Sequence, residues 1–252
     1  MSYKIEITNG IATFTINRPE MRNAINYAVM DGLETFLSKV ESDDSIAFAV
    51  ITGAGDRAFC SGGDLSEFHG FRTAKEAYPM LSRMAGLLYR LSILPVPVIA
   101  LVNGAAVGGG CEIASSCDYR LVSSKAKGGF IQGTLAITSG WGGASQLFAK
   151  MNNHTATLKF LSEAKVHTAQ QLQSIGWATD VFEGDAQEAL ENFISDKKKI
   201  HPSVHKAYKK LAITNWTQTG LKDRMIEEAA QCAKLWESDA HHEAVDRFLN
   251  KE

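Results

Sequence analysis

The sequence has few cysteines, few prolines and no long apolar run, and each scarcity excludes a class of protein. Its 252 residues include four cysteines and five prolines. The cysteines show no CxxC spacing, so we expect neither a disulfide framework nor a cysteine metal site. The longest apolar run, near residues 93–102, is half the roughly 20 residues that a transmembrane helix needs. The amino terminus has no apolar signal region, so we expect a cytoplasmic protein.

An excess of charge of either sign is also lacking. The chain has 26 Lys and Arg against 28 Asp and Glu, a formal net charge of −2. We therefore expect no attraction to nucleic acid or to an anionic membrane. His201 and His205 have the spacing of a metal-binding pair, but Pro202 and the lysines at 197–199 indicate a solvated helix start. We expect no metal site.

Strand and helix patterns alternate over the first three quarters of the chain. Residues 5–7 and 11–16 flank Asn9 and Gly10, which predicts a β-hairpin. Apolar spacing predicts helices over residues 26–40, 78–91 and 110–116, and buried strands over residues 48–51, 96–102 and 119–122. This alternation favours an α/β fold with largely parallel strands.

From about residue 186 onward the sequence shows only helical patterns. Apolar spacing predicts one helix from about residue 190 and others over residues 201–213, 221–236 and 241–249. We therefore divide the chain into a core, residues 1–185, and a C-terminal helical region, residues 186–252.

Two glycine-bearing turns carry the candidate chemistry, at residues 58–65 (AFCSGGDL) and 103–112 (NGAAVGGGCE). Each follows a predicted strand and opens a helical stretch, so each can present free backbone N–H groups. A thioester that gains negative charge on its carbonyl oxygen needs two such donors. Close helix–strand packing explains glycines in either turn equally well. Neither turn has the pattern of a phosphate-binding loop or of a dinucleotide-binding fold.

In combination, three segments resemble the crotonase, or enoyl-CoA hydratase/isomerase, superfamily. They are residues 17–24 (NRPEMRNA), 58–65 and 102–112, and Gly142 with the FLNK ending at 248–251 extends the similarity over nearly the whole chain. The resemblance implies a spiral core of β-β-α turns and a helical C-terminal region that mediates assembly into a homotrimer or a dimer of trimers. It also implies an acyl-CoA thioester substrate, with coenzyme A as part of the substrate and no separate cofactor.

The resemblance assigns catalytic roles to three residues. Gly63 and Gly109 match the two oxyanion-hole positions of the family, where backbone N–H groups act. Glu112 matches the first of the two glutamates that the hydratases use. Its apolar neighbours predict burial, and a buried carboxylate favours a role in proton transfer or in ordering water over an exposed helix position.

Five further positions match places that approach coenzyme A in the family. Arg22, Asn23 and Ala24 match the loop that lies along it, while Phe248 and Lys251 match positions that reach the nucleotide from a neighbouring subunit. For Arg22 and Lys251, solvated surface charge is an equal alternative.

The sequence departs from the family where hydratases carry their second glutamate. Residues 130–143 (FIQGTLAITSGWGG) contain no acidic residue, and Gln132 or Thr134 occupies the position. Neither acts as a general base near neutral pH. The layout of this segment is similar to that of ethylmalonyl-CoA decarboxylases. Decarboxylation needs no base, so an oxyanion hole and an apolar wall suffice, with Trp141 as the candidate wall or as ordinary packing.

These observations leave three hypotheses. The first is an acyl-CoA lyase of the hydratase/isomerase type, in which Gly63 and Gly109 hold a thioester enolate and Glu112 handles a proton. The second is a malonyl-type decarboxylase that uses the same oxyanion hole. The third is a catalytically silent protein that binds acyl-CoA or RNA on the same fold.

Overall fold

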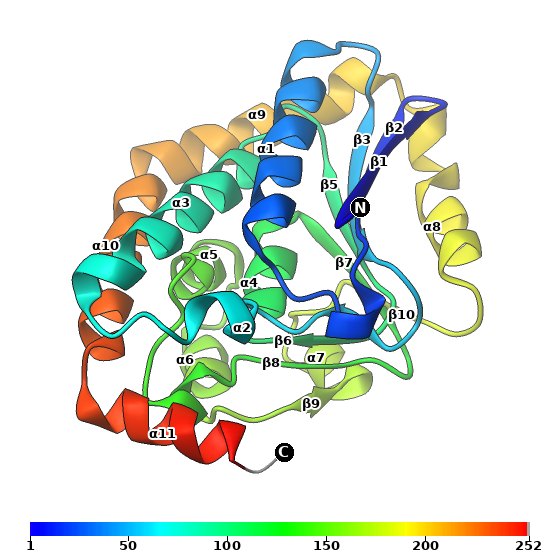
Figure 1. The fold of residues 1–252 in the computed structure, drawn as a ribbon. Coiled ribbons are helices and arrows are strands. Elements are labelled where there is room, and N and C mark those ends of the chain that lie inside the picture. Colours follow the sequence, from blue (N-terminus) through cyan, green and yellow to red (C-terminus); the bar gives the residue numbers. More distant parts are fainter. Residues whose placement is uncertain (251–252) are drawn as a thin grey trace.

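The computed structural model describes residues 1–250 and consists of two β-sheets surrounded by helices (Figure 1). The larger sheet has the order β1-β2-β3-β5-β7-β10 and the smaller one the order β4-β6-β8-β9. The hairpin pair β1–β2 and the pair β8–β9 are antiparallel, and the other pairs are parallel. The strands are β1 (Tyr3–Thr8), β2 (Ile11–Ile16), β3 (Phe48–Gly53), β4 (Ala58–Cys60), β5 (Val98–Val102), β6 (Ala105–Val107), β7 (Tyr119–Ser123), β8 (Lys127–Gly129), β9 (His167–Thr168) and β10 (Asp180–Phe182).

From β3 to β8, consecutive strands alternate between the two sheets. The pairs β3 and β4, β5 and β6, and β7 and β8 each place the first strand in the larger sheet and the second in the smaller one. Helices follow β4 and β6, and a short 3-10 helix follows β8, so the chain advances as a spiral of β-β-α turns. This topology brings the ends of β4, β6 and β8 side by side on the smaller sheet.

The larger sheet separates two apolar cores. In β3, Phe48 and Val50 belong to a small core that includes Leu190, whereas Ala49 and Ile51 face the main core. This division follows from the alternation of side chains along a strand, and it explains why residues 48–51 are all apolar. Figure 1 shows α8 on the outer side of the larger sheet, away from the other helices.

The helices have recognisable caps. Asn26 caps the first long helix by accepting from the N–H of Val29, and Thr73 and Glu76 form a capping box at the start of another. The helices are α1 (Tyr27–Ser42), α2 (Leu65–Phe68), α3 (Ala74–Ser92), α4 (Gly109–Ser116), α5 (Gly143–Lys150), α6 (His154–Ser162), α7 (Ala169–Ser174), α8 (Ala186–Ser195), α9 (Pro202–Gln218), α10 (Leu221–Trp236) and α11 (Asp239–Leu249), with 3-10 turns at Pro19–Met21, Gln132–Leu135 and Lys197–Lys199.

The last three helices wrap around one side of the core, where α10 packs against both α3 and α5 (Figure 1). Met225 of α10 lies so close to Gly142, just before α5, that a Cβ on that glycine would meet Met225 side-chain atoms at 2.5 Å. Among the described residues, no helix is both long and apolar enough to cross a membrane.

The predicted elements agree with the structure apart from their bounds, whereas the smaller sheet, α6, α7 and β10 were not predicted. The hairpin pairs Tyr3 with Ile16 as its turn requires. The helix expected from residue 78 begins at Ala74, because the Thr73 capping box starts it earlier. The strand expected from residue 96 begins at Val98, after Pro97. The three-residue strands β4, β6 and β8 were not predicted from periodicity, since three residues are too few to show one.

Candidate active site

The two glycine turns follow neighbouring strands and nearly touch each other. Strands β4 and β6 are paired in parallel, so the turns leave the sheet at the same edge. Gly62 has φ +102° and Gly108 has φ +55°, a conformation that favours glycine over residues with a Cβ. A Cβ placed on Gly62 would lie 3.3 Å from the backbone nitrogen of Gly109. The structure therefore brings the two turns together as predicted.

The N–H groups of Gly63 and Gly109 have no acceptor among residues 1–250. Their neighbours are anchored, because the Gly62 carbonyl accepts from Ile25 N at 2.8 Å and Gly108 N donates to the Gly129 carbonyl at 2.9 Å. Most buried backbone N–H groups in proteins are paired. Two unpaired amides on adjacent, anchored turns are the arrangement that can receive the oxygen of a ligand.

Trp141 lies against both glycines. A Cβ on Gly109 would lie 2.1 Å from the Trp141 ring, and a Cβ on Gly63 would lie 3.6 Å from it. The side chain is buried, at 4% exposure. One apolar ring thus borders the two free amides and leaves room at position 109 only for glycine.

Glu112 is buried on the first turn of α4 and accepts four hydrogen bonds. Its Oε1 accepts from Gln132 Nε2 at 3.0 Å and from Gly140 N at 3.3 Å. Its Oε2 accepts from Trp141 N at 2.8 Å and Gly143 N at 2.9 Å. The prediction of burial is confirmed, since the residue is 2% exposed. The carboxyl group therefore holds the chain segment that carries Trp141.

Burial raises the pKa of Glu112 to about 8, and the charge of Glu228 acts in the same direction. The backbone N–H groups of Gly143, Trp141 and Gly140 oppose this rise because they stabilise the carboxylate. A carboxyl group with this pKa is mostly protonated at neutral pH. It is suited to donate a proton rather than to remove one.

Of the two candidates for the position of the missing second glutamate, Gln132 lies beside Glu112. Its amide faces Glu112, whereas Thr134 is exposed and its hydroxyl donates to the Ile131 carbonyl at 2.7 Å. The 3-10 turn over Gln132–Leu135 thus directs Gln132, and not Thr134, toward Glu112. Within residues 1–250, the buried Oε1 of Gln132 has no hydrogen-bond partner.

Glu228 of α10 bonds to residues that flank Trp141, and the sequence patterns did not predict it as a site residue. It accepts from Ser139 Oγ at 2.5 Å, Ala144 N at 3.0 Å, and Ser145 N and Oγ at 2.8 and 2.7 Å. Its neighbours Met225, Ala229 and Cys232 form the buried face of α10. An acidic residue three positions after Met225 lies on that face, which was the available signal.

The loop at residues 22–24 runs beside the first glycine turn. The Arg22 carbonyl accepts from Ser61 N at 3.1 Å. The Asn23 side chain points inward, where Nδ2 donates to the Ala58 carbonyl at 2.7 Å, and Ala24 is buried. The Arg22 side chain is exposed. The side chain of Asn23 thus fastens the loop to β4, and only Arg22 and the backbone of this loop are placed to meet a ligand.

The other predicted residues lie at the margin. Asp64 caps α2 by accepting from Ser66 N at 2.9 Å and also pairs with Arg18 at 2.7 Å. Phe248 is 47% exposed on α11. Lys251 lies outside the described residues.

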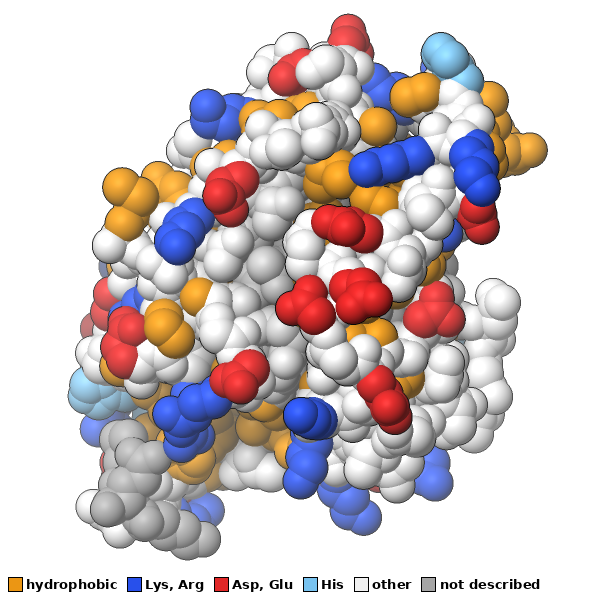
Figure 2. All heavy atoms as spheres, turned by 90° about the vertical axis from the view of Figure 1, so that its right-hand side faces the viewer, with side chains coloured by type: hydrophobic (Ala, Val, Ile, Leu, Met, Phe, Trp, Pro, Cys, Tyr) orange, Lys and Arg blue, Asp and Glu red, His pale blue; other side chains and the backbone are white. Residues whose placement is uncertain are grey.

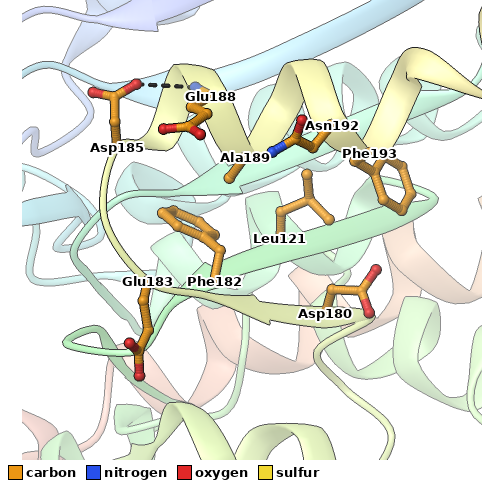
Figure 3. Close-up of a pocket in the computed structure, with 9 residues that line it drawn as sticks. All are labelled: Leu121, Asp180, Phe182, Glu183, Asp185, Glu188, Ala189, Asn192 and Phe193. Carbon is orange, nitrogen blue, oxygen red and sulfur yellow. Dashed lines mark hydrogen bonds between the residues drawn. The ribbon is translucent and has the colours of Figure 1, made fainter.

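A hollow of about 310 Å³ lies elsewhere, between α8 and the strands β7 and β10 (Figure 3). Its lining includes four acidic residues, Asp180, Glu183, Asp185 and Glu188. Figure 2 shows acidic side chains gathered on this face of the molecule. The apolar lining belongs to the small core, across the larger sheet from the glycine turns. An acidic hollow repels the phosphates of a CoA thioester, so we do not place the reaction there.

Comparison with known proteins decides the family. The family model described as Enoyl-CoA hydratase/isomerase matches residues 6–252. The chain belongs to the enoyl-CoA hydratase/isomerase family. It is therefore an enzyme that processes acyl-CoA thioesters, and the resemblance stated from the glycine motifs is confirmed.

Two curated relatives of this family member differ in the reaction they are named for. A short-chain-enoyl-CoA hydratase from Clostridium acetobutylicum is 30% identical, over 98% of this chain and 94% of the relative. An ethylmalonyl-CoA decarboxylase from Xenopus tropicalis is 32% identical, over 95% of this chain and 80% of the relative. The crystal structure of an enoyl-CoA hydratase from Bacillus halodurans superposes with a TM-score of 0.88 at 20% identity, covering 98% of this chain and 100% of that one. The fold is thus that of the family.

Proposed function

We propose that this enzyme decarboxylates a malonyl-type acyl-CoA and that the amides of Gly63 and Gly109 hold the thioester enolate. Gln132 is the observation that carries the proposal. Its amide Nε2, and not a second carboxylate, lies 3.0 Å from Glu112 Oε1. Addition of water to an enoyl-CoA requires a base and an acid acting together. Loss of CO₂ requires no base.

In the proposed step, the bond between the α-carbon and its carboxylate breaks and CO₂ leaves. The electron pair of that bond moves toward the thioester carbonyl, whose oxygen becomes negative and accepts hydrogen bonds from Gly63 and Gly109. The α-carbon of the enolate then takes up a proton. Glu112, with a pKa of about 8, holds that proton at neutral pH. Three of its four hydrogen-bond partners are backbone amides, so Gln132 is the partner that can turn away and open Oε1 to the substrate.

Two further observations support this reaction. Trp141 lies against both glycines and supplies an apolar surface beside the free amides, which favours a neutral product over a carboxylate. The relative from Xenopus tropicalis, named an ethylmalonyl-CoA decarboxylase, matches along 95% of this chain.

Hydration of an enoyl-CoA is the second candidate. It is favoured by the retained Glu112 and by the 30% identity to the Clostridium acetobutylicum hydratase over nearly the whole chain. In that case water must be activated by Glu112 alone, which requires the carboxylate form. Because the pKa of Glu112 is raised to about 8, hydration is expected to accelerate above neutral pH.

The purified enzyme tests the choice with ethylmalonyl-CoA, methylmalonyl-CoA and crotonyl-CoA. We expect release of CO₂ from the first two and little loss of enoyl absorbance from the third. The variant Gln132→Glu supplies a second carboxylate and is expected to lower CO₂ release and raise hydration. Rapid hydration of crotonyl-CoA by the unmodified enzyme, with no CO₂ from either malonyl-type substrate, contradicts the proposal.

We further propose that the enzyme is a cytoplasmic homotrimer or dimer of trimers and that coenzyme A enters only as part of its substrate, with no other cofactor. Exposed apolar residues of α9 support an interface between copies, since Val204, Tyr208 and Leu211 are 41%, 71% and 68% exposed at helical spacing. Light scattering coupled to gel filtration measures the assembly, and a monomer at micromolar concentration contradicts this part of the proposal.

A further inference from the structure

The segment at residues 139–145, which carries Trp141, is held by two carboxylates from different helices. Glu112 of α4 accepts from the backbone N–H groups of Gly140, Trp141 and Gly143. Glu228 of α10 accepts from Ser139, Ala144 and Ser145, whose side-chain and backbone donors lie 2.5 to 3.0 Å from it. Glu112 thus holds the middle of the segment, and Glu228 holds both of its ends.

Neither carboxylate has a cationic partner among residues 1–250. Two buried carboxyl groups around one segment are unfavourable, because burial and mutual repulsion both oppose their ionisation. Burial raises the pKa of Glu228 as it does that of Glu112. Four donors of the segment face the two oxygens of Glu228, and a neutral amide has only one oxygen to accept them. The arrangement therefore calls for an explanation beyond packing.

We propose that Glu228 is a positioning residue of the reaction, which holds segment 139–145 so that Trp141 stays against the Gly63–Gly109 pair and Glu112 stays in the site. This inference rests on the proposed enolate site at the two glycines. It does not depend on whether decarboxylation or hydration produces the enolate. Glu228 reaches the reacting atoms only through the segment, since its hydrogen bonds all go to residues 139–145.

The geometry shows why glutamine cannot replace Glu228 without loss. Oε1 accepts from the backbone N–H of Ala144 and Oε2 from that of Ser145, at 3.0 and 2.8 Å. In Glu228→Gln one of these oxygens becomes an NH₂ group, which faces a backbone donor that cannot rotate. One end of the segment is then released while the size of the side chain is kept.

Acetoacetyl-CoA provides the probe, because its enolate absorbs in the near ultraviolet and binds to an oxyanion hole without turnover. We expect Glu228→Gln to reduce the affinity for this enolate and kcat/KM for the substrate by roughly tenfold each. Glu227→Gln is the matched control on the same helix, since Glu227 is exposed and accepts one hydrogen bond within residues 1–250, from Gln231 Nε2 at 2.6 Å. It is expected to match the unmodified enzyme.

The direction in which the enolate affinity changes distinguishes a positioning role of Glu228 from a purely electrostatic role and from a purely structural one. A purely electrostatic role predicts tighter enolate binding in Glu228→Gln, because a negative charge near the bound enolate is removed. A purely structural role predicts unchanged enolate binding per folded molecule together with lower stability. Either result overturns the inference.

Two cases need a separate measurement or interpretation: a Glu228→Gln variant that does not fold, and an unmodified enzyme that binds no enolate. If Glu228→Gln does not fold, Ser139→Ala removes one donor to Glu228 and is expected to weaken enolate binding roughly threefold, and no change in that variant overturns the inference. If the unmodified enzyme binds no acetoacetyl-CoA enolate, the proposed enolate site itself fails, which is a separate outcome from equal binding by the enzyme and its variant.

Discussion

Among the described residues, the N–H of Gly109 at the amino end of α4 has no acceptor, whereas at the carboxyl end the carbonyls of Ser115, Ser116 and Cys117 all have donors. Lys150 Nζ donates to the carbonyls of Ser115, Ser116 and Cys117 at 3.1, 2.7 and 3.3 Å. Ser92 Oγ and Arg120 Nη1 add bonds to the last two, at 3.0 Å each. The ends of this eight-residue helix lie about 12 Å apart. A helix end with all groups paired stabilises the fold, while an end with a free donor can bind a substrate.

The comparison predicts that changes at the amino end affect turnover more than stability. The largest effect is expected for Gly109→Ala, because the new Cβ would lie 2.1 Å from the Trp141 ring and displace the ring or the amide. Loss of one oxyanion donor costs about 3–4 kcal/mol of barrier, so turnover should fall 10²- to 10³-fold. Gly86→Ala is the control, since nothing lies within 4 Å of its added Cβ. Steady-state kinetics measure both variants, and a fall of less than tenfold for Gly109→Ala would remove Gly109 from the site.

Glu112→Gln tests the other group at the amino end. If Glu112 donates the proton, turnover should fall about 10²-fold. The unmodified enzyme should also lose kcat/KM as the pH rises through about 8, because the carboxyl group then loses its proton. The variant should lack this decline. A pH profile that is the same in both proteins argues against proton transfer by Glu112.

At the carboxyl end, Lys150→Met should lower stability and leave turnover nearly intact. Methionine keeps the apolar contacts of the side chain but cannot donate to the three carbonyls, and Ser115 loses the donor that it does not share. We expect the free energy of unfolding to fall by about 2–3 kcal/mol. Lys159→Met is the control, because Lys159 is 71% exposed and its ion pair with Glu163 spans 3.5 Å. Urea unfolding measures the difference, and a loss of turnover beyond twofold in folded Lys150→Met would contradict this separation of roles.

Local patterns in the sequence predicted the elements of the fold that depend on local interactions. The hairpin, α1 and α10 follow from turn residues and apolar spacing, and the segments at residues 17–24, 58–65 and 102–112 in combination predicted the family. The smaller sheet was missed because its strands have two or three residues each. It forms only when the spiral brings β4, β6 and β8 together.

The surroundings of Glu112 depend on contacts between distant parts of the chain. Gln132 reaches Glu112 only because a 3-10 turn orients its amide, which residue spacing alone does not distinguish from Thr134. Glu228 lies more than 80 positions after the segment that it holds and is brought there by the packing of α10 on α5. Sequence reasoning identified the residue types of the site but not the network that positions them.

The dependence of stability on pH provides the finest test of the two ends, because their titratable groups are shifted in opposite directions. Glu112 has a folded pKa of about 8 against an ordinary 4.5, so the folded state holds the extra proton and stability falls as pH rises from 4.5 to 8. Burial lowers the pKa of Lys150 from 10.5 to about 7, so the unfolded state holds the extra proton and stability rises between pH 7 and 10.5. Each slope is at most about 1.4 kcal/mol per pH unit.

The measurement compares each variant with the unmodified enzyme. Subtracting the unfolding free energy of Glu112→Gln from that of the unmodified enzyme should give a difference that decreases as the pH rises from 4.5 to 8. The same subtraction for Lys150→Met should give a difference in unfolding free energy that grows between pH 7 and 10.5. Slopes of the same sign for the two variants would show that the two ends of α4 are not electrostatically distinct.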